Sequence, residues 1–122
     1  MTMKFLSGWG YNMANLTPKS FYIGSGSATD AYTTANTVGN YSIIKNINLC
    51  NTTSSNAVCS IHILVGAATA AANNKVVSNV TVLANNVVYY NTSVVIPANS
   101  KIYVDQVTAN AVTFTISGVE YA

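Results

Sequence analysis

The residues able to do acid–base chemistry are few in this sequence of 122 residues. The carboxylates are Asp30, Asp105 and Glu120, and the one histidine is His62. A glycoside hydrolase brings two carboxylates to within about 5–10 Å of each other, whereas these lie in separate regions of the sequence. His62 stands between two isoleucines without an acid or nucleophile beside it, which indicates a histidine at a sheet surface or an interface rather than a general base. We therefore expect no catalytic residues and no enzymatic activity.

The two cysteines, Cys50 and Cys59, flank a polar loop. A disulfide between them is geometrically possible if the two flanking strands form a hairpin. Reduced thiols are the favoured interpretation, because a cytoplasm supplies no oxidant. A closed zinc site uses more ligands than the two thiols and His62 together offer. The sequence thus predicts reduced cysteines, no metal site and no cofactor.

Charge is scarce, and what there is lies scattered along the chain. Charged residues make up 7% of the sequence, and the net charge of +2 comes from five lysines without any arginine. Nucleic-acid binding favours clustered Arg and Lys, so we expect no nucleic-acid partner. Asn, Ser and Thr, about a third of the chain, must supply the polar surface. Because such a surface provides little charge repulsion between copies, it is typical of a chain that packs against others.

The apolar segments are too short to cross a membrane. The best run, residues 63–72, is interrupted by Gly66 and Thr69 and falls short of the roughly 18 residues that a span needs. Glycine and asparagine also break residues 1–16, so the continuous apolar core of a secretion signal is missing. We expect no membrane partner and a chain made and kept in a cytoplasm.

Alternation of apolar and polar residues predicts strands throughout the second half of the chain. It is clearest over residues 112–117 and recurs at 59–65, and at 76–82 with Val76, Val80 and Val82 on one face. In residues 42–49, Lys45 falls on the face of the apolar residues, which predicts either an edge position or a β-bulge. We expect strands over residues 20–23, 31–34, 41–49, 58–65, 75–83, 87–96, 101–107 and 111–119.

Turns that contain an Ala-Asn pair are expected between the strands of the second half of the chain. These pairs occur at residues 72–73, 84–85, 98–99 and 109–110, and Asn tolerates the positive φ of tight turns. Short strands at this spacing are typical of a sandwich or barrel. The alanine-rich residues 66–72 are too short for a stable helix and are expected to form a loop. The sequence predicts an all-β fold, a two-sheet antiparallel β-sandwich of jelly-roll or immunoglobulin-like topology, over residues 31–122.

Residues 1–30 have a different character and are expected to form an extended N-terminal arm. Glycine and proline interrupt them, while aromatic residues are spread through them, including the one tryptophan. Such a segment forms little core of its own, and aromatic side chains are enriched at interfaces. The candidate interface residues are Phe5, Trp9, Tyr11, Phe21 and Tyr22.

From Tyr41 onward the sequence resembles small virion structural proteins of tailed bacteriophages, including cyanophages. The resemblance is carried by the segments SIIKNINLCNTT at 42–53, SIHILV at 60–65 and VTFTISGVEY at 112–121. It implies a β-sandwich that decorates or completes the particle without enzymatic activity. The implied location is the capsid surface of a virion assembled in the cytoplasm of the bacterial host.

Two functions follow from this resemblance. The first is a capsid decoration, or cement, protein that binds the major capsid protein and copies of itself, as a trimer, at junctions between capsid subunits. The second is a module of a tail, neck or fibre that binds carbohydrate on the host surface. Tyrosine rings could stack on sugars in that case, and the candidates are Tyr32, Tyr41, Tyr89, Tyr90 and Tyr103.

Overall fold

The computed structural model describes residues 16–34 and 41–121. Strands dominate these ranges, as expected from the abundance of Val, Ile, Thr and Tyr. A short 3-10 turn, η1 (Ala72–Asn74), lies within the loop expected at the alanine-rich segment. The strands are β1 (Leu16–Gly24), β2 (Thr29–Thr33), β3 (Tyr41–Asn51), β4 (Ala57–Val65), β5 (Lys75–Val82), β6 (Val87–Pro97), β7 (Ser100–Gln106) and β8 (Val112–Tyr121).

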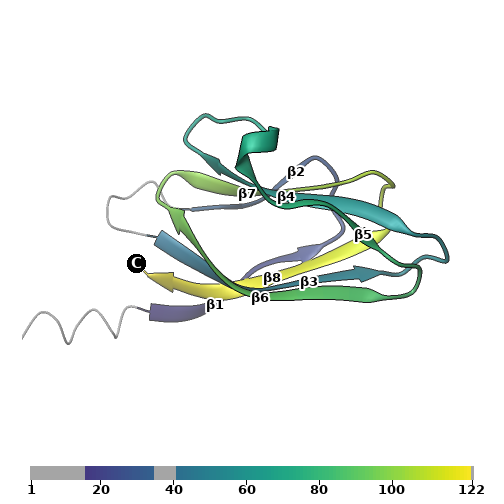
Figure 1. Ribbon diagram of the computed structural model, residues 1–122. Helices are drawn as coiled ribbons and strands as arrows, with labels where there is room; N and C mark the ends of the chain where they lie inside the picture. Colours follow the sequence, from purple (N-terminus) through teal and green to yellow (C-terminus); the bar gives the residue numbers. More distant parts are fainter. Residues whose placement is uncertain (1–15, 35–40, 122) are drawn as a thin grey trace, which may run out of the picture.

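The strand pairing is that of a long hairpin rolled into two sheets (Figure 1). Antiparallel pairs join β1 to β8, β2 to β7, β3 to β6 and β4 to β5. Rolling then pairs β3 with β8 and β4 with β7. The result is sheet A, in the order β1-β8-β3-β6, packed on sheet B, in the order β2-β7-β4-β5. The expected two-sheet antiparallel sandwich is confirmed, and its topology is the jelly roll.

The core lies between the two sheets and follows the predicted alternation. In β8, Val112, Phe114 and Ile116 are buried, while the residues between them are only partly so. Facing sheets pack about 10 Å apart, so these side chains meet those of sheet B. The other fully buried large side chains include Ile44, Leu49, Ile61, Ile96, Ile102, Val82 and Val104.

A β-bulge at Lys45 explains the irregular pattern of β3. The register of β3 shifts between Ile44 and Asn46 against both of its neighbours. Lys45 is therefore turned outward, where its Nζ lies 2.9 Å from Ser93 Oγ. Gly118 on β8 lies against this bulge, and a Cβ there would come within 1.9 Å of the Ile43 carbonyl oxygen. Of the two expected alternatives, an edge position and a bulge, the structure shows the bulge, and it requires a glycine on the adjacent strand.

A second bulge, at Asn79, makes one sequence-based assignment wrong. Asn79 has a φ of 47°, and the register of β5 against β4 shifts beside it. Ser60 stabilises the bulge, because its Oγ accepts a hydrogen bond of 2.9 Å from the Asn79 N–H. The extra residue reverses the alternation before it, so Val77 faces the core and Val76 is exposed. Strict alternation had placed Val76 inward.

The structure also corrects the expected boundary between arm and sandwich at residue 30. β1 is a full member of sheet A, paired with β8 along its length. Phe21 is 5% exposed and belongs to the core, while Tyr22 packs against that core. Neither is an exposed arm residue, because both belong to strand β1 of the sandwich. The remaining candidate interface residues, Phe5, Trp9 and Tyr11, lie outside the described residues.

Candidate functional site

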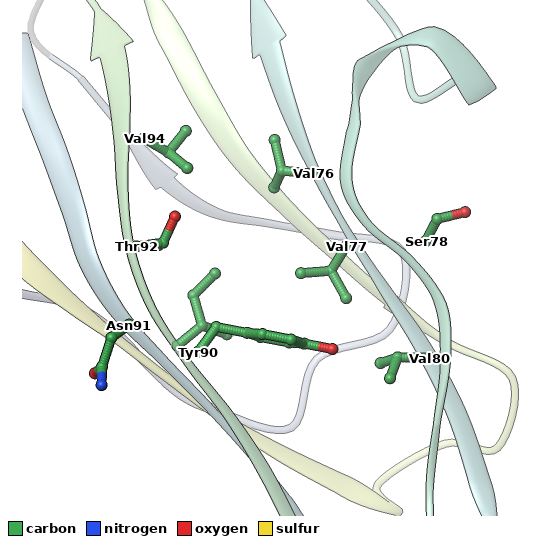
Figure 2. Close-up of a pocket in the computed structure, with 9 residues that line it drawn as sticks. Val76, Val77, Ser78, Val80, Tyr90, Asn91, Thr92 and Val94 are labelled. Carbon is green, nitrogen blue, oxygen red and sulfur yellow. The ribbon is translucent and has the colours of Figure 1, made fainter.

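An apolar groove opens where the edge strand of one sheet faces the edge strand of the other. β5 is an edge of sheet B and β6 is an edge of sheet A. Between them lies a cavity of about 370 Å³ that is partly open to solvent, and Figure 2 shows the residues that line it. We call it the β5/β6 groove. It is lined by Ile47, Val76, Val77, Ser78, Val80, Tyr90, Asn91, Thr92 and Val94.

The lining is mainly apolar, with Ser78, Asn91 and Thr92 as its polar residues, and carries no formal charge. Figure 2 shows valines from both strands turned toward the groove, with the ring of Tyr90 extending between them toward Val77 and Val80. The rims are accessible, since Val76 is 41% exposed and Tyr90 is 36% exposed. Pockets that hold ligands typically have volumes of about 300–1,000 Å³, so this groove suits one or two large apolar side chains.

Apolar surface continues beyond the groove along β6. Val87, Tyr89 and Val95 lie on the opposite face of the strand and are exposed, as is Leu83 in the turn before it. Long exposed edge strands usually carry charge that prevents pairing with other chains, whereas β6 contains no charged residue. This edge of the molecule is therefore open to association.

The other pair of edge strands, β1 and β2, is closed by side chains. The rings of Phe21 and Tyr32 contact each other with centroids 4.9 Å apart. Tyr32 Oη donates a hydrogen bond of 2.6 Å to Glu120 Oε2 on β8, and Lys19 Nζ lies 3.7 Å from the other carboxylate oxygen. Burial, and next the hydrogen bond to Glu120, raise the pKa of Tyr32. We call this region the β1/β2 side.

Gln106 fixes the connection between β1 and β2 from within. Its Nε2 donates to the carbonyl oxygens of Ser25 and Gly26 at 3.0 and 2.9 Å, and its Oε1 accepts from the Val112 N–H at 2.8 Å. The side chain is buried, so it replaces water for backbone groups that the sheets leave unpaired. Sequence reasoning missed this residue. Its signal was an amide at an inward position of the alternating strand β7.

The carboxylates occupy structural positions at separate points. Asp30 forms an ion pair with Lys101 at 3.3 Å, and Glu120 belongs to the β1/β2 side. Asp105 accepts hydrogen bonds from the backbone N–H groups of Ala28 and Gln106 at 3.1 and 2.9 Å. Within the described ranges, no cluster of three or more His, Cys, Asp or Glu could hold a metal ion.

The position of His62 differs from the sheet surface or interface expected from the sequence. His62 lies on the outer face of β4 but is buried, and the turn η1 packs against β4 beside it. Its Nδ1 is 2.6 Å from Asn74 Oδ1, and its ring meets that of Tyr103 edge-on at 5.5 Å. Asn74 also binds the backbone of Ala71 and Thr69. His62 thus anchors this loop to the sheet.

The cysteines do not face each other across a hairpin. Cys50 lies on β3 in sheet A and Cys59 on β4 in sheet B. Alternation turns Cys50 outward and Cys59 into the core, so the two thiols are free. Burial raises the pKa of Cys59 to about 11, which makes its thiol a poor nucleophile at neutral pH.

The five candidate tyrosines are dispersed over the molecule. Tyr32 belongs to the β1/β2 side, Tyr41 stacks on Tyr121 at 5.0 Å, and Tyr103 packs against His62. Tyr89 and Tyr90 point to opposite faces of β6, because neighbouring residues of a strand alternate. Tyr90 is thus the member of this set that lines the β5/β6 groove.

The described part of the chain contains no helix long and apolar enough to span a bilayer. A comparison with protein-family models finds no match to this chain, and searches of curated proteins and of solved structures find no significant similarity either.

Proposed function

We propose that this chain is a non-enzymatic structural protein of a tailed-phage virion, and specifically a capsid decoration protein that binds at junctions between major capsid subunits. The observation that carries the proposal is the β5/β6 groove, an uncharged apolar surface left open on a jelly-roll sandwich. Interface cores are depleted in charge and enriched in aromatic and apolar side chains. The groove and the neighbouring face of β6 have this composition.

The rest of the described surface supports assembly rather than catalysis. Carboxylates and His62 are engaged in contacts that hold loops and edges. Sheet A also exposes amides and hydroxyls, such as Thr17, Ser93 and Asn91, and the side chain of Asn91 is joined to that of Asn46 by a hydrogen bond of 3.0 Å. Surfaces of this kind contact a partner through many weak polar interactions, and the stability of the complex then comes from the area buried at the interface.

A tail, neck or fibre module is the alternative within the same class of structural protein. Tyr90 at the groove and Tyr89 on the outer face of β6 are exposed, and either ring could stack on a sugar. A carbohydrate site would require one of them as the stacking surface. A glycan array probed with the wild type, Tyr89→Ala and Tyr90→Ala separates this alternative from protein–protein attachment.

The copy number per particle tests the proposal. Quantitative mass spectrometry of purified virions, with the major capsid protein of the same digest as internal standard, should find hundreds of copies. A few to a few dozen copies would favour the tail, neck or fibre. Absence of the chain from purified particles would overturn both placements.

A further inference from the structure

We propose that the β5/β6 groove receives residues 5–11 of a second copy of this chain, with Trp9 as the central anchor. The proposal concerns association between copies and does not depend on a virion location. It follows from the chemistry of the groove, the composition of the segment that precedes β1, and the distance between the start of β1 and the groove.

The groove and the segment match in chemistry. Residues 1–15 contain Phe5, Leu6, Trp9 and Tyr11 and a single charged side chain, Lys4. The groove offers valines from two strands and one tyrosine ring, again without charge. A Trp side chain buries roughly 150–250 Å², and aromatic anchors seated in apolar pockets are the usual hot spots of an interface.

The sequence around Trp9 also suits insertion between two edge strands. Gly8 and Gly10 flank the tryptophan on both sides. Glycine lacks a side chain, so the backbone can approach another backbone closely. An extended segment here could place its backbone against the unpaired edge of β6, as in strand addition, while the indole enters the groove.

The distance from the start of β1 favours a second copy over the same copy. Leu16, Tyr121, Tyr41 and Pro97 lie in one row across sheet A. β1 and β6 are opposite edges of that sheet, about 14 Å apart at roughly 4.8 Å per strand. Thr92 lies in the middle of the groove. Along β6 it is about 16 Å from Pro97, at roughly 3.3 Å per residue.

The straight path from Leu16 to the middle of the groove is therefore about 22 Å. The segment between Trp9 and Leu16 spans at most about 25 Å when fully extended. That leaves almost no length for reversing direction at Leu16 and passing round the edge of β6. A neighbouring copy removes this constraint. Donation from one copy to the next is a heterologous contact, which closes into a ring when the rotation between copies permits.

Sedimentation of full-length variants tests the proposal. Trp9→Ala removes the anchor, and Val76→Asp places a charge at the exposed rim of the groove. Val107→Asp is the matched control, because Val107 follows β7, is 80% exposed and belongs neither to the groove nor to β6. We expect the first two variants to weaken self-association at least about 10-fold, as for loss of a hot spot, and Val107→Asp to associate like the wild type.

Mixing the two defective variants gives the decisive result. Trp9→Ala retains the groove and Val76→Asp retains the anchor, so an equimolar mixture should form one-to-one heterodimers although each variant alone is monomeric. Ser78→Asp, at another exposed position of the lining, replaces Val76→Asp if the latter fails to fold. The proposal is overturned if the wild type stays monomeric, if the Val76 and Val107 variants associate equally, or if the mixture contains only monomers, as docking within one copy would give.

Discussion

The two sides of the sandwich at which edge strands of the two sheets face each other differ in how far side chains close them. On the β1/β2 side, a contact between two aromatic rings, a part-buried hydrogen bond from Tyr32 to Glu120 and a buried hydrogen bond from Val112 to Gln106 join the two sheets. On the opposite side, β5 and β6 face each other mainly through valines and leave the β5/β6 groove between them. A jelly roll has two such sides, and closing each requires side chains of sufficient size. Here the large side chains are concentrated on one side, so that side provides stability and the other remains available to a partner.

The largest difference between the sides should appear on truncating an aromatic residue of each. Phe21→Ala removes a buried ring and should lower the free energy of unfolding by about 3–5 kcal/mol. Tyr90→Ala removes a ring that is 36% exposed and should cost less, about 1–2 kcal/mol, because part of the ring already contacts water in the folded state. Urea denaturation of dilute protein measures both values. Equal losses would mean that the groove side is as important to the fold as the β1/β2 side.

A smaller difference is expected for two amide side chains. Gln106→Ala leaves the carbonyl oxygens of the β1–β2 connection and the Val112 N–H without their buried partner, which should cost about 1–3 kcal/mol. Asn91→Ala loses one exposed contact with Asn46 and should stay within about 0.5 kcal/mol. Thermal unfolding followed by circular dichroism compares the two. If Gln106→Ala proved as stable as Asn91→Ala, water would be replacing the amide and the β1/β2 side would not be closed.

The pH dependence of stability should identify Tyr32 as part of the closed side. Its pKa is raised in the folded state, first by burial and then by Glu120, whereas an unfolded tyrosine titrates near pH 10. The contribution is complete below about pH 10 and declines above it, because the unfolded state then loses its proton first. Tyr32→Phe lacks this proton. Its stability deficit relative to the wild type, measured by urea denaturation at pH 7 and pH 11, should shrink at the higher pH, and a constant deficit would contradict the raised pKa.

The smallest effect concerns the two thiols, which report whether the sheets separate. Native protein treated with iodoacetamide at pH 7.5, about one unit below the ordinary cysteine pKa, should be modified at Cys50 and not at Cys59. Cys59 is buried between the sheets, and its pKa is about 11. Mass spectrometry after digestion distinguishes the sites, and a sample unfolded in urea serves as the control in which both react. Rapid native modification of Cys59 would show that one side opens readily.

Much of this architecture could be predicted from local patterns, because a strand that faces a core on one side must alternate. For the same reason, Lys45 predicted either a bulge or an edge position, and the inner place of β3 in sheet A decides for the bulge. Asn79 could not be identified as a bulge, because its stabilising partner, Ser60, lies on another strand. Local alternation therefore assigned Val76 to the core instead of Val77.

Features that depend on distant contacts were not accessible to sequence reasoning. Phe21 was assigned to an arm because glycine and proline surround it, whereas its ring partner, Tyr32, reaches it only once the two sheets have packed. The β5/β6 groove is lined by edges of two different sheets, so no single stretch of sequence indicates it. The uncharged surface was predictable from composition, but its concentration at one side of the sandwich required the topology.

Amide hydrogen exchange of the full chain at low and at high protein concentration tests most directly whether the open side is the docking side. Association through the groove should slow exchange in β5 and β6, and in residues 5–11, as the concentration rises, while β1 and β2 exchange at the same rate throughout. Val76→Asp should abolish this protection and Val107→Asp should retain it. Protection that grows at β1 and β2, or that is the same in both variants, would contradict the assignment of the groove as the interface.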